Sequence, residues 1–398
     1  MRKLVIIPSE PLKLYKEKGI SDWLEEYYNP KGYFDEVYLL SPKEQLRRFQ
    51  YGMHIIPVAS MKHFRFLLRR INPVCVRSYG AYWATEYAVL NRINQIPVVA
   101  SIHDINPKLI FKSFFKADII FSMSHATTRI VTNSGFNKDN IYTIGNRLDF
   151  KKFSKINDAS IREIRAKFPN GNMLLFVGRL AYQKNIETII KSLALLPSDY
   201  FLVLIGPGSN LIYQKLGMHL DILDRLFFMG SVNNSSLPMW YNACDVFVSP
   251  SRWEGFGVTL LEAAACQCKI VTSNISPINE FILAEDLGIR LLDDYLSELD
   301  FANAIQELQQ LAEAEHLKSN STYSYIKGKF SYSVVCDREI DVYSKIVNEN
   351  FEQSFVKQIA LQLERFFYCV KNQIFNLRTR ISNSYKLKSL VRTLRLNL

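Results

Sequence analysis

Short apolar runs alternate with amphipathic and polar stretches along most of the chain. These runs predict five strands in the first part, with a helical pattern at 81–94, and six strands in the second part. The predicted strands cover residues 4–7, 36–40, 74–78, 98–102, 118–122, 173–177, 201–205, 227–229, 245–249, 269–272 and 288–292. Strands that alternate with helices indicate an α/β fold with doubly wound parallel sheets.

The stretch 146–167 is polar and charged, and it separates the two series of strands. We therefore expect a linker there, between a Rossmann-like domain at 1–155 and a second one at 156–348, with a helical tail at 349–398. Two such halves imply a cleft between them. Because parallel sheets bind ligands at the carboxyl ends of their strands, we expect the site to face this cleft.

Gly178, Arg179 and Lys184 follow the predicted strand 173–177 and precede a helical stretch. Two cations at the carboxyl end of a strand, beside a helix N-terminus, are suited to bind a diphosphate. The alternative is an Arg and a Lys that are solvated on a surface loop. Gly206 begins a Gly-Pro-Gly turn that either borders a nucleotide or is an ordinary turn, and the backbone at Gly230 is a candidate contact of a nucleobase.

The most informative segment holds Glu254 and Glu262, on either side of a glycine loop and the beginning of an alanine-rich helix. If the helix begins just after the glycines, Glu262 lies about one turn inside it and both carboxylates face the same ligand. Carboxylates accept hydrogen bonds from the hydroxyls of sugar and ribose. The alternative is two acids that complement a helix dipole. The backbone N–H groups expected to point at the diphosphate are those of Gly255, Phe256, Gly257 and Val258.

The chain resembles the retaining glycosyltransferases of family 4, which have the GT-B fold. Besides the segments around Glu254 and Lys184, the resemblance rests on ordered motifs at 99–104, 117–122, 146–153, 205–208, 228–230 and 330–334. It covers about residues 1–348. It implies two Rossmann-like domains that face a cleft, with the last helix of the second domain crossing back to the first.

The resemblance also implies a role for each matching position. Arg179 and Lys184 would bind the diphosphate of a nucleotide-sugar donor, Glu254 the hydroxyls of its sugar, and Glu262 its ribose. His103 would face the transferred sugar, although an ordinary histidine at a strand end is the alternative. The family needs no metal ion and no cofactor. The implied reaction is retaining transfer of a sugar to a hydroxyl of a glycan or lipid-linked acceptor, in surface polysaccharide biosynthesis.

Three features before residue 349 depart from the family pattern. The segment 8–19 stands where a glycine-rich loop is common, which leaves Lys18 and Gly19 as candidates for a phosphate contact from the first domain. Arg147 and Gln267 replace glycines that we expect at structural turns.

The net charge of +11 is uneven, because residues 351–398 hold nine Lys or Arg and two acids. Apolar side chains recur at helical spacing from 355 to 381 in this tail. A basic amphipathic helix is typical of binding to an anionic membrane surface. Packing on the enzyme or on a second copy is the alternative. The tail carries no recognised nucleic-acid-binding motif, so we expect no nucleic-acid partner.

The chain has no apolar run of spanning length and no recognisable signal peptide, so we expect a cytoplasmic protein at the inner face of the membrane. Two alternatives to a transferase stay open: another GT-B sugar-nucleotide enzyme such as an epimerase, and a non-catalytic GT-B scaffold. No Gly-x-Gly-x-x-Gly follows the first strand, which argues against a dinucleotide oxidoreductase. The donor base, the donor sugar and the acceptor are not determined by the sequence.

Overall fold

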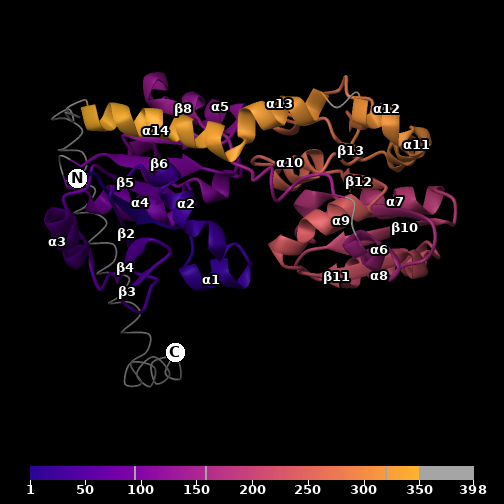
Figure 1. Cartoon of the computed structure of the whole chain (residues 1–398), viewed down its shortest axis with the longest axis horizontal. Helices are drawn as coiled ribbons and strands as arrows, with labels where there is room; N and C mark the ends of the chain where they lie inside the picture. The colour runs from indigo at the N-terminus through magenta and orange to yellow at the C-terminus, as the bar shows by residue number, and fades with distance from the viewer. Residues whose placement is uncertain (94–95, 157–158, 319–320, 349–398) are drawn as a thin grey trace, which may run out of the picture.

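The structure is a computed structural model that describes residues 1–93, 96–156, 159–318 and 321–348. Its strands form two sheets, one in each of two lobes that lie side by side (Figure 1). The strands of the first sheet are β1 (Lys3–Ile7), β2 (Glu36–Ser41), β3 (Arg48–Gln50), β4 (Met53–Pro57), β5 (Cys75–Tyr79), β6 (Val98–Ile102), β7 (Ile119–Ser122) and β8 (Ile141–Thr143). The α-helices of this lobe are α1 (Leu12–Glu17), α2 (Leu24–Tyr28), α3 (Met61–Ile71), α4 (Trp83–Asn91) and α5 (His125–Asn133).

The second sheet has its own set of covering helices. Its strands are β9 (Asn172–Val177), β10 (Tyr200–Ile205), β11 (Leu226–Gly230), β12 (Val246–Ser249), β13 (Ile270–Ser273) and β14 (Ile289–Leu292). The helices from α6 onward are α6 (Ala159–Arg165), α7 (Ile186–Leu195), α8 (Leu211–His219), α9 (Leu237–Ala243), α10 (Val258–Ala265), α11 (Glu298–Gln310), α12 (Glu313–Lys318), α13 (Ser321–Phe330) and α14 (Tyr332–Asn348).

Both sheets are doubly wound, which confirms the predicted fold class. The first sheet has the order β3-β4-β2-β1-β5-β6-β7-β8, and within the described residues only its β3–β4 pair is antiparallel. The second sheet has the order β11-β10-β9-β12-β13-β14 with parallel pairing throughout. The strand order reverses between β1 and β5 in one sheet and between β9 and β12 in the other. Ligands of such sheets bind at these switch points.

All eleven predicted strands are present, with each end within one residue of its predicted position. Strands β3, β4 and β8 were not predicted from the sequence. β3 and β8 are edge strands of three residues without fully buried positions, so they lack the apolar signal of a central strand. β4 has only a short apolar run that ends at Pro57. The predicted helix at 81–94 is shorter, since α4 ends at Asn91.

The stretch 146–167, predicted as a linker, lies between β8 of the first sheet and β9 of the second, and three of its apolar side chains pack on the body of the protein. Leu148 and Phe153 are buried in the hydrophobic core, and α6 packs on α9 through the buried Ile164. These apolar side chains anchor the connection, while most of its charged residues stay half-buried or exposed. The domain boundary at 155 stays a prediction.

Helix α14 runs from the second lobe back over the first, as Figure 1 shows. It contacts the turn at Pro30–Gly32, where Lys31 pairs with Asp337 at 2.5 Å. Tyr343 packs edge to face on Phe34, with ring centroids 5.0 Å apart. The helix therefore ties the two lobes together. The predicted tail at 349–398 lies outside the described residues.

Candidate active site at the junction of the two sheets

Two loops meet where the strand order of the second sheet reverses. One follows β9 and contains Arg179 and Lys184, and the other follows β12 and contains Glu254. Backbone and side-chain hydrogen bonds join them, since Arg252 N donates to Gln183 O (2.9 Å) and Gln183 Nε2 donates to Trp253 O (2.8 Å). The neighbouring positions of β9 and β12 thus fix the two loops against each other. The structure brings the predicted cation and carboxylate loops together.

Lys184 and Glu254 form a buried ion pair. Lys184 Nζ lies 2.5 Å from Glu254 Oε1, and both side chains are about nine-tenths buried. Ser251 Oγ donates to the same carboxylate oxygen at 2.7 Å. Among the described residues both bonds go to Oε1, which leaves Oε2 of Glu254 as an acceptor for a hydroxyl. The ammonium group has three N–H donors, so pairing with Glu254 does not exhaust it.

Arg179 is exposed at the mouth of the β9 loop. Its Nη2 donates to Gln183 Oε1 at 2.9 Å, which holds the guanidinium beside the loop. An exposed cation next to a buried one is suited to the outer and inner oxygens of a diphosphate. This role of Arg179 stays a prediction.

Glu262 lies one turn inside α10 and is buried. Burial raises the pKa of its carboxyl to about 7, while the hydrogen bond from Tyr241 and the nearby Lys152 counteract part of this shift. Tyr241 OH donates to Glu262 Oε2 at 2.7 Å. Near neutral pH this carboxyl therefore exchanges between an acceptor and a donor of hydrogen bonds, and both forms can bind a diol.

Helix α10 begins as the sequence predicted. Gly257, at φ 96°, is its N-cap residue and Val258 is its first residue. Only glycine adopts this left-handed conformation without strain. The N-terminus of α10 thus faces the same loop as Glu254, where its dipole favours a negative ligand.

The other predicted glycines have mixed explanations. A β-carbon at Gly206 would lie 1.9 Å from the carbonyl oxygen of Gly178, so packing between the two loops accounts for Gly206. Gly230 has φ 66° and open space around its missing β-carbon. Contact of Gly178, Gly206 or Gly230 with a donor stays a prediction.

His103 comes from the first lobe, directly after β6. Its Nε2 lies 2.8 Å from Ser101 Oγ, and burial, with the guanidinium of Arg77 as a second cause, lowers its pKa to about 4. Arg77 itself is buried against the rings of Tyr79 and Phe121. His103 is therefore neutral at physiological pH. One of its ring nitrogens donates a hydrogen bond and the other accepts one.

The first lobe touches the carboxylate loop at Gly255. A β-carbon on Gly255 would lie 2.0 Å from His103 O, and Ser124 Oγ donates to Gly255 O at 3.2 Å. The loop that holds Glu254 thus packs directly on the loop that holds His103. Sequence reasoning placed these residues on separate domains, and the fold brings them into one site.

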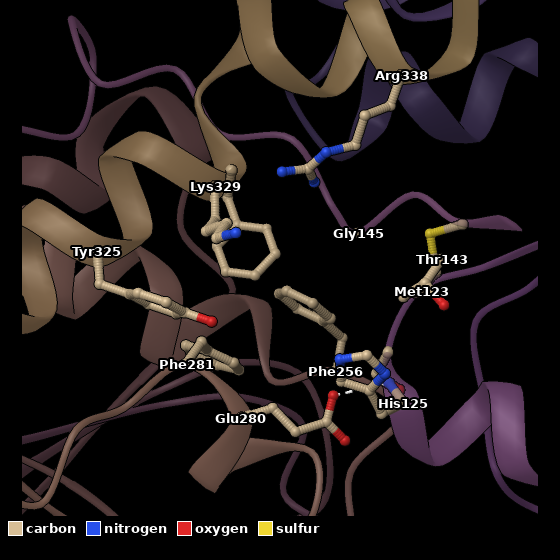
Figure 2. A pocket seen from close by; sticks show the side chains of 12 residues that line it. Met123, His125, Thr143, Gly145, Phe256, Glu280, Phe281, Tyr325, Lys329 and Arg338 are labelled. Carbon is tan, nitrogen blue, oxygen red and sulfur yellow. Dashed lines mark hydrogen bonds between the residues drawn. The ribbon is translucent and has the colours of Figure 1, made fainter. Parts of the chain in front are cut away.

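A cavity of about 250 Å³ lies between the lobes behind this loop, and Figure 2 shows its lining. Phe256 stacks on Phe281 with ring centroids 5.0 Å apart and forms one wall. Glu280 of the second lobe accepts hydrogen bonds from the backbone N–H groups of His125 (2.7 Å) and Ala126 (3.0 Å) at the N-terminus of α5. A carboxylate at a helix N-terminus is stabilised by the dipole, so this contact helps to hold the lobes together.

A second cavity of about 300 Å³ opens beside Glu262. The second lobe contributes Glu262, Val258 and Asn234, and the first lobe contributes aromatic side chains that include Trp23 and Tyr27. This aromatic wall was not predicted from the sequence. The available signal was the aromatic residues Tyr15, Trp23 and Tyr27, which lie within and just after the segment 8–19.

The features that depart from the family pattern have clear structural roles. Lys18 pairs with Glu10, and a β-carbon on Gly19 would collide with Asn233, so Gly19 is a contact between the lobes. Gln267 has φ 58° and lies at a turn, as expected. The expectation of a turn at Arg147 is wrong, since the left-handed residue there is Gly145 (φ 82°).

Arg147 is instead a buried partner of α14. Its Nη2 lies 2.7 Å from Glu339 Oε1, and its guanidinium lies over the ring of Tyr27.

No group of three or more potential metal ligands occurs among the residues that the structure describes. Within the same residues, no helix is long and apolar enough to cross a membrane.

Known proteins resemble this chain in sequence. Residues 157–323 match the family of group 1 glycosyl transferases. An uncharacterised glycosyltransferase of Methanocaldococcus jannaschii is 27% identical over 248 residues, which is 61% of each chain. The lipopolysaccharide core mannosyltransferase LpsB of Rhizobium meliloti is 32% identical over 142 residues, 33% of this chain and 40% of LpsB. The chain thus spans less than two thirds of the length of these relatives.

The fold has close structural counterparts as well. HepE of Anabaena, solved with UDP and glucose, superposes with a TM-score of 0.68 at 15% identity, over 87% of this chain and all of HepE. This likeness concerns the fold, while the sequence matches concern the family. Together they show that the chain has the two-lobed GT-B fold of known glycosyltransferases and that its residues 157–323 match the group 1 glycosyl transferases.

Proposed function

We propose that this protein is a retaining glycosyltransferase that moves a sugar from a nucleoside-diphosphate-sugar to a hydroxyl of a glycan or lipid-linked acceptor in surface polysaccharide biosynthesis. The observation that carries the proposal is the buried Lys184–Glu254 pair at the switch point, packed against the loop of His103. A cation for phosphate and a carboxylate for hydroxyls in one place suit a nucleotide-sugar. The similarity to LpsB, a mannosyltransferase of lipopolysaccharide core biosynthesis, supports the proposal that the product is a surface polysaccharide.

In this mechanism Arg179 and Lys184 bind the diphosphate and stabilise the charge that develops on it as it leaves. Glu254 Oε2 accepts a hydrogen bond from a hydroxyl of the transferred sugar, and neutral His103 contacts the same sugar from the first lobe. The bond between the anomeric carbon and the phosphate oxygen breaks while the acceptor oxygen bonds to that carbon on the same face. The acceptor's proton goes to the leaving phosphate, so no protein base is assigned.

Retention follows from the resemblance to family 4 enzymes. We also propose that the reaction needs no metal ion, because Arg179 and Lys184 supply the positive charge that a divalent cation would otherwise supply. The protein would work in the cytoplasm, at the inner face of the membrane where lipid-linked acceptors are available.

A thermal-shift screen against UDP-, GDP-, dTDP- and ADP-sugars tests the donor, since a bound donor raises the melting temperature. The stabilising donor is then incubated with candidate acceptors, and NMR of the product gives its anomeric configuration. Turnover in EDTA should equal turnover in Mg²⁺. Inversion at the anomeric carbon, or loss of activity in EDTA, would contradict the proposal.

The tail carries a separate expectation. Removal of residues 351–398 should move the protein from anionic vesicles toward solution, because nine of its cations leave with it. Sedimentation with vesicles measures this. Binding that is unchanged by the deletion would refute a membrane role of the tail.

A further inference from the structure

The formal charge of the described part is concentrated in one short region. Residues 42–72 hold seven Lys or Arg and one acid, a formal charge of +6, whereas residues 1–350 together carry +4. The remainder of these 350 residues is therefore slightly acidic, at −2. The region comprises β3, β4 and α3 at one edge of the first sheet, at the outer end of the first lobe (Figure 1).

Helix α3 presents a cationic stripe to solvent. It packs inward through Phe64, Leu68 and Ile71, which are buried. The exposed positions are Lys62, Phe66, Arg69 and Arg70. Spacings of three and four residues place them on one face of the helix. None of these three cations pairs with a carboxylate among the residues that the structure describes.

Large apolar side chains accompany these cations. Phe66 is 55% exposed in the middle of the stripe, and Phe49 of β3 is 67% exposed. Phe49 stands opposite His54 in the β3–β4 pairing and packs edge to face on its ring. His54 and Ile56 lie on the same side of β4, and Ile56 belongs to the core cluster under α3, so Phe49 lies on the α3 side of the sheet. Leu46, just before β3, is 70% exposed.

We propose that this basic face, defined as Lys62, Phe66, Arg69 and Arg70 of α3 with Leu46 and Phe49, docks the folded protein on an anionic lipid bilayer. Cations attract anionic headgroups, and exposed Phe and Leu insert at the boundary of headgroups and acyl chains. A nucleic acid would use the cations and could stack bases on Phe49 or Phe66, but it gains nothing from the exposed aliphatic Leu46, whereas a bilayer accommodates all three apolar side chains. The inference is independent of the tail. It rests on the proposed function only for its purpose, which is to bring a lipid-linked acceptor within reach.

The test uses the full chain and sedimentation with vesicles of phosphatidylcholine alone or with 30% phosphatidylglycerol. Lys62→Gln/Arg69→Gln/Arg70→Gln removes three exposed cations. We expect it to weaken binding to the anionic vesicles by about tenfold or more. The matched control, Arg162→Gln/Lys191→Gln/Lys215→Gln, removes three exposed cations from α6, α7 and α8 and should change binding by less than about twofold.

Phe66→Ser separates insertion from charge. It should lower the part of the binding that persists in 0.5 M salt by about threefold or more, whereas Ile212→Ser, at a comparably exposed position of α8, should leave that part unchanged. The proposal would be overturned if the triple variant of α3 bound anionic vesicles as well as the natural chain does. It would also be overturned if the α3 variants and their controls lowered vesicle binding equally. Lost binding of an RNA oligonucleotide with unchanged vesicle binding would overturn it in favour of a nucleic-acid surface. Because sedimentation needs neither donor nor acceptor, this result and the test of sugar transfer can fail separately.

Discussion

Gly255 of the second lobe lies so close to His103 of the first that a β-carbon on Gly255 would stand 2.0 Å from the carbonyl oxygen of His103. The contact joins the loop that carries Glu254 to the strand end that carries the histidine. It couples the position of one proposed sugar contact to that of the other. The two lobes can therefore approach this closely only because residue 255 has no side chain.

Gly255→Ala should hold the lobes apart without unfolding either of them. We expect kcat/KM for sugar transfer to fall by about 100-fold, because small displacements of contacting groups carry costs of that order. Gly328→Ala is the control, since a β-carbon there meets nothing within 4 Å. Steady-state kinetics and melting temperature are compared for both. Normal kinetics for Gly255→Ala would contradict a closed working state.

Glu254→Gln and Lys184→Ala should separate catalysis from stability. Glu254→Gln keeps an acceptor for Ser251 but loses the charge, so turnover should fall by about 100-fold or more. Lys184→Ala should also cost about 3 kcal/mol of unfolding free energy, because it leaves a buried carboxylate without its partner. Urea denaturation and initial rates measure the two effects. Near-normal turnover of the Glu254→Gln variant would show that Glu254 does not contact the transferred sugar.

Glu262 should make stability depend on pH. Its pKa is about 7 in the folded protein and 4.5 as the reference value, so its proton stabilises the fold below pH 4.5 and this contribution is lost between pH 4.5 and 7. The loss amounts to about 3 kcal/mol. Glu262→Gln should therefore gain stability relative to the natural chain as pH rises from 5 to 8. Parallel melting curves for the two chains would show that Glu262 does not titrate in this range.

The Arg147–Glu339 pair should hold α14 on the first lobe. Both side chains are 5% exposed, and Glu339 Oε2 is buried without a hydrogen-bond partner in the described part of the chain. Arg147→Met or Glu339→Leu alone should each cost about 3–5 kcal/mol of unfolding free energy. The double variant should cost less than the sum, because no unpaired charge remains. Additive losses in denaturant titrations would mean that the two charges do not interact.

Local patterns identified much of this molecule. The eleven predicted strands rest on apolar runs that are buried on both faces of a parallel sheet, and such runs are visible without any partner. The beginning of α10 at Gly257 was predictable because a positive φ requires a residue like glycine. The packing of the connection at 146–167 was not predictable, because its few apolar residues are too widely spaced to reveal that they join the core.

The sequence by itself determined the chemical inventory: Arg179, Lys184, Glu254 and Glu262 at the ends of predicted strands, with His103 in the first half. Only the tertiary structure decided which of them meet. It paired Lys184 with Glu254, placed Gly255 against His103 and put an aromatic wall opposite Glu262. It also left Lys62, Phe66, Arg69 and Arg70 exposed on one face of α3. The physical reason is that strand order and domain closure depend on contacts between residues up to hundreds of positions apart. A local pattern of apolar and polar residues carries no record of such contacts.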